Sequence, residues 1–291
     1  MDKIYIIERF LEYLNSTERS ASTISSYTSD LYLFSRWFEE TNHEIVSAIK
    51  ITPTDLRKYK KYLIEHPMKP NTINRKLGVI KSFINWLWET GKLKQRFPLP
   101  KLVKQIIVAP KWLDKNQQHQ MLRHLEKYAG ERDTAIIKLL LNTGIRVHEL
   151  HKLQWRDVKI SDRGGSIAIR YSKAEKYRDV PLNKDARSSL TLLGFKDNAG
   201  KNTFVLQGQR GALSIRGIQK MLQRRLEYTS FDKVSPHVLR HTFCKNLVDA
   251  EVSLEKVAML AGHDSLDTTR LYCQPSFDDL AESVERIGEE E

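Results

Sequence analysis

The sequence predicts a mainly α-helical protein whose N-terminal part is all helix and whose C-terminal part mixes helices with one small antiparallel sheet. Three patterns lead to this prediction. Apolar residues recur three and four positions apart through residues 1–91, which is the spacing of amphipathic helices. Residues 92–112 contain three prolines and no steady period, as expected of a boundary between domains. Within residues 158–182, apolar and polar side chains alternate as they do in strands.

Four helices are expected in the N-terminal part. The first two follow from the apolar spacing of Ile7, Phe10, Leu11 and Leu14, and then of Leu31, Phe34, Trp37 and Phe38. Thr52 and Pro53 form a start signal for the third helix, and Pro70 begins the fourth. We place this domain at residues 1–97 and a basic linker at residues 98–111.

The second domain is expected over residues 112–291. Two helices come first, over residues 114–130 and 132–144, and the second is so densely apolar that it is expected in the core. The strands that follow turn around residues 163–165 and 173–176. After the sheet, helices return over residues 216–228, 235–250, 253–262 and 265–273.

The charge of the chain indicates a polyanionic partner. Its 291 residues include 48 Lys and Arg against 36 Asp and Glu, a net charge of +12, and 40% of them are hydrophobic. That hydrophobic share excludes a disordered chain, and the excess of positive charge favours nucleic acid binding. The net charge is +7 over residues 1–110, +11 over 111–277 and −6 over 278–291. Two basic bodies suggest two cationic faces, and the acidic tail suits a protein contact.

Several classes of protein are excluded by simple patterns. No apolar run approaches the ~18 residues that span a bilayer, and the N-terminus is charged where a signal peptide would be apolar. Cys244 and Cys273 are too few for a disulfide framework and lack the C-x-x-C spacing of zinc or redox sites. We therefore expect a soluble, cytoplasmic protein in a reducing compartment, with no membrane partner.

Basic side chains lie on predicted helices whose other faces are apolar, as contact with DNA phosphates requires. In the first domain they are Arg57, Lys58, Lys60, Lys61, Arg75, Lys76 and Lys81. In the second domain they are Arg216, Lys220 and Arg224. For the residues of the first domain, an ordinary solvated helix face is the alternative interpretation.

Two pairs of residues in the second domain share a helix face. Arg146 and Glu149 lie three apart, so that Glu149 can hold Arg146 in place. His237 and Arg240 are also three apart, in the first turns of a helix capped by Ser235, where free backbone N–H groups favour an anion. The first pair taken alone is a weak signal, and a pair such as the second is as often an ordinary surface salt-bridge partner.

Three further residues lie at or beyond the ends of predicted elements. Lys173 lies at the tip of the expected hairpin, where it can present an ammonium group to a groove, although a charged residue that blocks edge pairing is the commoner case. His263 follows Gly262 at a helix end, and Tyr272 comes nine residues after His263.

Taken together and in order, these residues resemble the tyrosine recombinase (phage-integrase-like) family. The segments that carry the resemblance are TGIRVHEL, SKAEKYRDVPL, HVLRHTF and GHDSLDTTRLY. The N-terminal segments STISSYTSDLYLFSRWF and NTINRKLGVIKSFINWLWETGKL are similar to the family's core-binding domain. The resemblance implies a four-helix, SAM-like core-binding domain and a mixed α+β catalytic domain with a three-stranded antiparallel sheet. The layout is most similar to Xer-type recombinases and transposon-encoded tyrosine resolvases.

The resemblance also implies a reaction. Tyr272 is expected to attack the scissile phosphate and form a 3′-phosphotyrosyl link, which conserves the bond energy without ATP, a metal ion or another cofactor. Arg146, Arg240 and His263 are expected to stabilise the charge of the transition state. Rejoining to another strand, in two rounds through a Holliday junction, recombines two duplexes.

The remaining roles follow from the same resemblance. Lys173 is expected to protonate the leaving 5′-oxygen, His237 to act as general acid or base, and Glu149 to orient its neighbours. The lysine segment departs from many relatives because Ser172 and Ala174 stand where glycines are frequent, so Lys176 competes for the role of Lys173.

Other polar residues near these motifs are not expected to take part in catalysis or metal binding. His148 and His151 lie three apart, not four as in H-E-x-x-H zinc sites, and no third ligand is evident, so no metal site is expected. His241 is expected to be structural, and Cys273 to be a small buried side chain.

The acidic tail is expected to form an amphipathic helix over about residues 277–288. Phe277, Leu280, Val284 and Ile287 lie at helical spacing on one face. A lone helix of this length is marginal in water, so it should dock, either on its own domain or on another protomer. The resemblance favours docking in trans, which would link four subunits in a ring.

Two other functions stay open at this point. One is a non-catalytic DNA-binding regulator on the same scaffold, and the other is a type IB-like topoisomerase that acts as a monomer. A recombinase would use the same residues to resolve dimers or transposition cointegrates and to integrate or excise a mobile element. Whether it acts with an accessory protein or a partner recombinase also stays open. The target sequence depends on base contacts that charge does not reveal.

Overall fold

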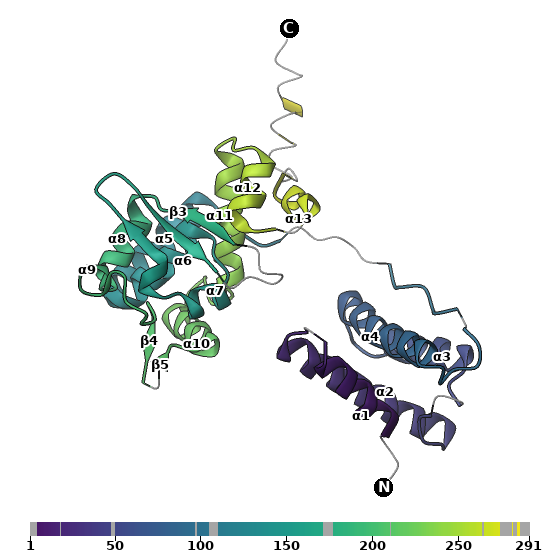
Figure 1. The fold of residues 1–291 in the computed structure, drawn as a ribbon. Helices are drawn as coiled ribbons and strands as arrows, with labels where there is room; N and C mark the ends of the chain where they lie inside the picture. The colour runs from purple at the N-terminus through teal and green to yellow at the C-terminus, as the bar shows by residue number, and fades with distance from the viewer. Residues whose placement is uncertain are drawn as a thin grey trace. The chain divides into compact units, whose positions relative to one another are not determined.

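The computed structural model describes residues 5–17, 19–47, 50–96, 98–104, 110–170, 177–209, 211–263, 265–273, 281, 284 and 285. The chain divides into two compact units, Met1–Ile107 and Val108–Glu291. Helices dominate both units, and the second contains a three-stranded antiparallel sheet (Figure 1). The predicted fold class is therefore confirmed. No helix in the described part of the chain is long and apolar enough to cross a bilayer.

The first unit contains the four expected helices. They are α1 (Tyr5–Asn15), α2 (Ala21–Asn42), α3 (Pro53–Glu65) and α4 (Pro70–Glu89). Helix α2 contacts each of the other three, and α3 contacts α4. Local sequence sets where α3 begins, because the Thr52 side chain and the Asp55 carboxylate cap each other's backbone N–H groups. The core is rich in aromatic rings: Phe34 and Tyr59 lie 4.9 Å apart edge to face, and Phe10 and Phe83 lie 5.3 Å apart.

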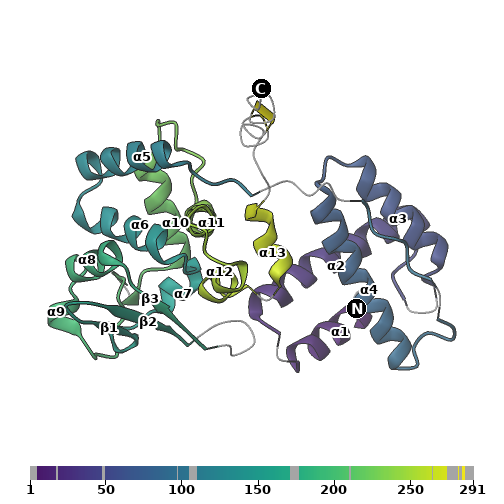
Figure 2. The same cartoon turned by 90° about the horizontal axis from the view of Figure 1, so that it is seen from above.

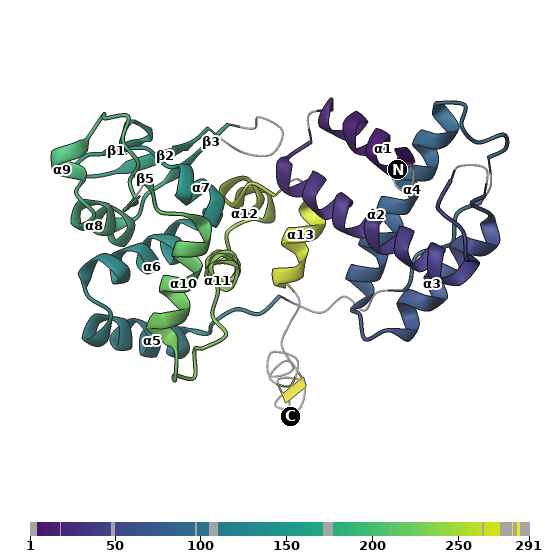
Figure 3. The same ribbon diagram turned by 90° about the horizontal axis from the view of Figure 1, so that it is seen from below.

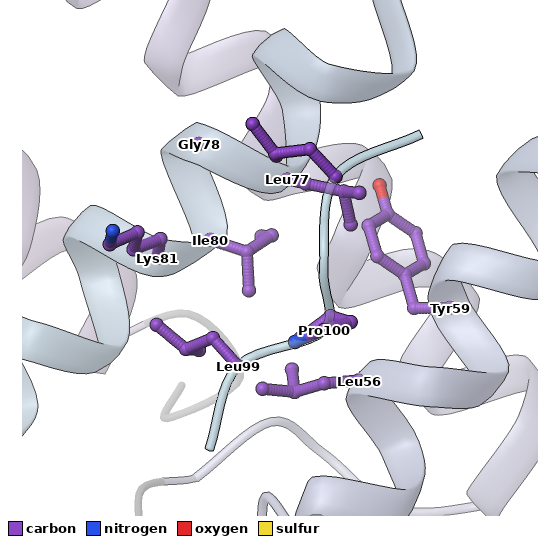
Figure 4. Close-up of a pocket in the computed structure, with 9 residues that line it drawn as sticks. Leu56, Tyr59, Leu77, Gly78, Ile80, Lys81, Leu99 and Pro100 are labelled. Carbon is purple, nitrogen blue, oxygen red and sulfur yellow. The ribbon is translucent and has the colours of Figure 1, made fainter. Parts of the chain in front are cut away.

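Residues 98–104, which fall in the expected linker, pack against α3 and α4 of the first unit. The Asn74 side chain exchanges two hydrogen bonds with the backbone of Val103, at 2.9 and 2.8 Å, and Lys60 Nζ donates to the carbonyl of Lys101 at 2.7 Å. Leu99 and Pro100 cover a cavity of about 40 Å³ between α3 and α4 (Figure 4). The hydroxyl of Tyr59, at this cavity, has no hydrogen-bond partner in the described chain.

The second unit alternates helices with short strands. Before the sheet come α5 (Lys115–Tyr128), α6 (Glu131–Thr143), α7 (Val147–Lys152) and the 3₁₀ turn η1 (Trp155–Asp157). The strands are β1 (Val158–Ile160), β2 (Gly165–Ile169) and β3 (Arg178–Pro181). After them come α8 (Lys184–Leu192), α9 (Phe195–Asn198), β4 (Gln207–Gly208), β5 (Gly211–Ala212), α10 (Ile215–Leu226), α11 (Pro236–Asp249), α12 (Leu254–Ala261), α13 (Leu266–Arg270) and η2 (Leu271–Cys273).

The main sheet has the order β1-β2-β3, with antiparallel neighbours. Ile167 pairs with Val158 on one side and with Val180 on the other, and all three side chains are buried. The same register sets Ile169 opposite Arg178. A second ribbon, β4 with β5, was not predicted, because strands of two residues are too short to show alternation.

Helix α6 is the centre of the second core. It contacts α5, α8, α10 and α11, and α5 and the sheet lie on its opposite sides (Figures 2 and 3). Contacts all round explain why this helix is apolar on nearly every face. It ends at Gly144, which adopts the left-handed conformation with φ +60°.

Gly144→Ala should destabilise the protein by about 2–4 kcal/mol, measured by urea unfolding. About 1 kcal/mol comes from the left-handed backbone, and the rest from overlap of the new Cβ with the Phe243 ring. Gly200→Ala is the matched control, because φ is +76° there and no atom lies within 4 Å of the added Cβ. Equal losses of unfolding free energy in the two variants would show that overlap with Phe243 adds nothing to the cost of the left-handed backbone.

Candidate active site

The predicted site residues of the second unit gather where α7, α11, α12 and η2 approach one another. Helix α11 contacts α12 and η2, and α12 lies beside α11 and α13 (Figure 3). Six predicted residues are described here: Arg146, Glu149, His237, Arg240, His263 and Tyr272. Lys173 and its competitor Lys176 lie outside the described residues.

Arg146 and Glu149 interact at the start of α7. The backbone N–H of Arg146 donates to Glu149 Oε2 at 2.7 Å, which satisfies a free donor of the helix N-terminus. The guanidinium of Arg146 donates to Glu149 Oε1 at 3.1 Å and to the carbonyl of Gly262 at 2.5 Å. Glu149 is 3% exposed and therefore requires compensation of its charge.

Arg178 provides most of that compensation, and its role was not predicted from the sequence. Its two terminal nitrogens donate to Glu149 Oε1 at 2.9 Å and Oε2 at 2.8 Å, a bidentate pair. Burial alone would raise the pKa of Glu149, but the hydrogen bonds and charge of Arg178, with those of Arg146, lower it below its usual value. Alternation could have revealed Arg178, because it shares the inward face of β3 with Val180, where a charge needs a buried partner.

Arg240 is buried on α11, with 4% exposure. Its guanidinium donates to the carbonyl of Gly144 at 2.7 Å, so the end of α6 holds it in place. Burial, and then the charge of Arg146, lower the pKa of Arg240 to about 10. Its hydrogen-bond partner is a carbonyl and not a carboxylate, so much of its charge stays available to an anion.

Tyr272 lies in η2 and is 1% exposed. Its hydroxyl oxygen lies 2.6 Å from Nδ1 of His241, the histidine expected to be structural. Its ring is nearly parallel to that of His263, with centroids 6.1 Å apart. Burial, and then the neighbouring Cys244 thiol, raise the pKa of Tyr272, so the phenol is neutral at pH 7.

Three histidines surround these groups in the neutral form. Burial is the largest cause that lowers the pKa of each, followed by nearby positive charge. For His263 the arginines Arg240 and Arg146 contribute, and the pKa is about 4. The pKa of His241 is also about 4, with contributions from His237 and Arg240. The pKa of His237 is lowered in the same direction by desolvation, Arg240 and Arg146.

The basic residues of the first unit are mostly engaged within the protein. Arg75 and Lys76 both pair with Asp30, whose side chain is 2% exposed. Lys60 holds the Lys101 carbonyl, Lys61 lies 3.7 Å from Glu65, and Arg57 donates to Thr54. Lys58 and Lys81 are exposed.

On α10 the arrangement differs. Arg216, Lys220 and Arg224 are exposed and lie four residues apart, so they form one line along the helix. Their charges have no carboxylate partner in the described parts of the chain.

The remaining predictions have mixed outcomes. Within the residues that the structure describes, no three His, Cys, Asp or Glu side chains are grouped as a metal site would require. His151 Nδ1 lies 2.9 Å from the carbonyl of Leu213. The burial predicted for Cys273 is wrong: it is exposed, at the last residue of η2. Most of the expected tail helix, including Phe277, Leu280 and Ile287, lies outside the described residues.

Comparison with known proteins assigns the family. Residues 111–278 match the model of the phage integrase family, and residues 7–91 match the phage integrase N-terminal SAM-like domain. The chain belongs to the phage integrase family. The resemblance found in the sequence is thereby confirmed over both parts of the chain.

Relatives of this family member are tyrosine recombinases. A tyrosine recombinase XerC of Oceanobacillus iheyensis is 30% identical over 294 residues, which cover 95% of this chain and 93% of the relative. A tyrosine recombinase XerC of Staphylococcus haemolyticus is 31% identical, covering 88% of this chain and 87% of the relative. The XerH site-specific recombinase, solved in a post-cleavage complex with palindromic difH substrate, shares the fold with a TM-score of 0.75 at 20% identity, over 92% of this chain and 80% of that one. Membership in this family supports site-specific recombination and a DNA strand-transferase activity.

The stability of this phage integrase family member should fall as the pH is lowered from 7 to 5. His241 and His263 have folded-state pKa values of about 4, below the ordinary 6.5, so the unfolded chain binds more protons in this range. Each histidine should contribute a loss on the order of 1 kcal/mol at pH 5. His241→Gln and His263→Gln should each reduce the loss, measured by urea unfolding at both pH values. The exposed His119→Gln should keep the wild-type dependence, and a wild-type dependence in all three variants would contradict the assignment.

Proposed function

We propose that this protein is a site-specific tyrosine recombinase that cuts and rejoins DNA through a 3′-phosphotyrosyl intermediate. The observation that carries the proposal is the grouping of Arg146, Arg240 and His263 beside Tyr272 within one largely buried site. Arg146 and Arg178 both pair with the single carboxylate of Glu149, which leaves a net positive charge. A net positive charge suits a phosphate diester.

The reaction can be written with these residues. The Tyr272 oxygen attacks phosphorus, its proton passes to a neighbouring base, and the bond from phosphorus to the 5′-oxygen breaks. Arg146 and Arg240 neutralise the non-bridging oxygens, and His263 donates a further hydrogen bond. Lys173, or Lys176 in its place, protonates the leaving oxygen. One phosphoester bond replaces another, so the step itself requires neither ATP nor a metal ion.

Two histidines are candidates for the base. His237 is the residue that the family resemblance suggests, and it lies on the first turn of α11 beside Arg240. His241 is the residue in hydrogen-bond contact with the Tyr272 hydroxyl. Both are neutral at pH 7, so either can accept a proton. Glu149 takes the orienting role, because two arginines lower its pKa and keep the carboxylate ionised.

Cleavage requires a movement of Tyr272. A side chain with 1% exposure does not reach a DNA phosphate from where it lies. Since Tyr272 stands in the short turn η2, a displacement of this turn on DNA binding would bring the hydroxyl to the phosphate without disturbing the α6 core.

The proposed assembly follows from the reaction. Exchange of strands between two duplexes needs four active sites, so a homotetramer on two double-stranded DNA sites is the expected form, with the acidic tail docked in trans. The tetramer would act in the cytoplasm at the nucleoid. The recombining DNA would pass through a Holliday junction. Dimer or cointegrate resolution and integration or excision of a mobile element are the candidate roles, with or without an accessory protein or a partner recombinase.

Wild-type protein should form a denaturant-resistant adduct with nicked duplexes drawn from DNA that flanks its own gene. Tyr272→Phe should bind the same duplexes and form none, because phenylalanine lacks the nucleophilic oxygen. Tyr228→Phe is the matched control, since Tyr228 is 96% exposed, and it should form the adduct.

An adduct with Tyr272→Phe would show that another residue is the nucleophile. Tight binding without any adduct from wild type would favour the non-catalytic regulator. Relaxation of supercoiled DNA by a monomer, without pairing of two sites, would favour the topoisomerase.

Removal of the basic line on α10 should weaken DNA binding mainly through phosphate contacts. The triple variant Arg216→Gln, Lys220→Gln, Arg224→Gln should lower the slope of log affinity against log salt by about 2–3 units, at about 0.9 per phosphate contact. Fluorescence anisotropy across a potassium chloride series measures this slope. The comparison variant Arg75→Gln, Lys76→Gln should change the slope by less and reduce stability, because Asp30 loses both partners. An unchanged slope in the triple variant would exclude α10 from the DNA surface.

A further inference from the structure

Arg178 occupies an unusual position for an arginine. It is the first residue of β3, pairs opposite Ile169, and shares the inward face of the strand with the fully buried Val180. Its side chain is only 12% exposed. A guanidinium in such a place must have its charge and donors satisfied by specific partners.

Its partners come from two other segments of the site. The terminal nitrogens bind both oxygens of Glu149 on α7, at 2.9 and 2.8 Å. The remaining nitrogen, Nε, donates to the carbonyl of Leu260 in the last turn of α12, at 3.2 Å. Arg178 thus joins β3, α7 and the end of α12 through one planar group.

The connections close into a ring. Glu149 binds the backbone and guanidinium of Arg146, and Arg146 in turn donates to the carbonyl of Gly262. Gly262 lies directly against Arg178: a Cβ added there would stand 2.7 Å from a terminal nitrogen of Arg178. Gly262 also has φ +67°, and His263 follows it in the chain. The ring therefore fixes the backbone from which His263 extends.

The charges of the ring divide in a particular way. Glu149 makes its bidentate pair with Arg178 and a single side-chain contact, at 3.1 Å, with Arg146. Arg178 therefore neutralises most of the carboxylate, and the charges of Arg146 and Arg240 are left for another anion. Without Arg178, the buried carboxylate would draw Arg146 into a tighter pair and away from that anion.

We propose that Arg178 is a positioning residue of this active site: it engages Glu149 so that most of the charge of Arg146 stays available to the phosphate, and it holds the Gly262 backbone so that His263 is correctly placed. The proposal rests on the proposed recombinase function. Arg178 itself touches no reacting atom in the proposed cleavage reaction.

A second ion pair on the same sheet provides a matched control. Arg170, directly after β2, pairs with Asp157 through Nε at 2.5 Å, and the Asp157 side chain is 2% exposed. Arg170→Met therefore also leaves a buried carboxylate without its arginine, and within the described residues Arg170 has no ion pair with Glu149.

The experiment compares Arg178→Met, Arg178→Lys and Arg170→Met with wild type in the rate of covalent adduct formation on nicked duplexes. Arg178→Met should slow the rate about 100-fold, the effect of a misplacement of about 1 Å, while DNA affinity changes only a few-fold. Arg178→Lys should recover part of the rate, because it keeps the charge but loses the bidentate pair. Arg170→Met should stay within a few-fold of wild type after correction for the folded fraction, measured by urea unfolding.

A substrate of lower charge separates positioning from general damage. A methylphosphonate at the cleavage site carries a methyl group in place of a non-bridging oxygen, so it is uncharged and lacks the negative charge that Arg146 would neutralise. The deficit of Arg178→Met should therefore shrink on this substrate. Equal deficits on both substrates, or equal rates for Arg178→Met and Arg170→Met, would overturn the proposal and leave Arg178 as a structural ion pair.

Hydrogen exchange tests the placement without any chemistry. Amides of residues 144–149 and 258–263 should exchange faster in Arg178→Met than in Arg170→Met. Equal exchange in the two variants would overturn the positioning role, whatever the activity. An absence of adduct with wild type that binds DNA would instead count against the recombinase function itself, so the two failures are distinguishable.

Discussion

The buried carboxylate of Glu149 is the constraint on which the arrangement of the site depends. With 3% exposure it has almost no solvent, so the fold must bring donors to it. Two arginines and a backbone N–H do so, and they come from the start of α7 and the start of β3. Because the same arginines also bind carbonyls at the end of α12, the carboxylate holds three separate segments in register. The site is therefore rigid where the arginines lie, although Tyr272 stands on a short turn.

The arginines around this carboxylate outnumber it, so the site carries a net positive charge. Arg146, Arg178 and Arg240 lie close together, and Glu149 is the carboxylate that they contact or face among the described residues. Burial, and then the charge of Arg146, disfavour the positive charge of Arg240, which is why its pKa falls to about 10. A phosphate diester would supply the missing negative charge. The same uncompensated charge would therefore strengthen a complex with DNA.

Spacing in the sequence predicted contacts between residues close in the chain and missed contacts between distant ones, whereas the grouping of Arg146, Arg240, His263 and Tyr272 was predicted from the family resemblance. Helix starts such as Thr52 with Asp55 and the pair Arg146 with Glu149 lie within four residues, so spacing reveals them. The partners of Arg178 and Tyr272 lie 29 and 31 residues away, and only the folded chain brings them together. Lys76 looked free in the sequence because Asp30, 46 residues before it, packs beside it only in the bundle. A net positive helix face thus predicts a DNA surface poorly until its internal ion pairs are known.

Phosphate binding should also change the proton chemistry of the site. Burial and the charges of Arg240 and Arg146 lower the pKa of His237 and His263, so both are weak proton acceptors in the free protein. An anion between the two arginines offsets their charge, and the pKa of a neighbouring histidine then rises. Tyr272 meanwhile is neutral and buried, with its pKa raised. In the proposed reaction, a histidine whose pKa rises beside a phosphate and a tyrosine that has to leave a buried position would together restrict cleavage to DNA that is already bound.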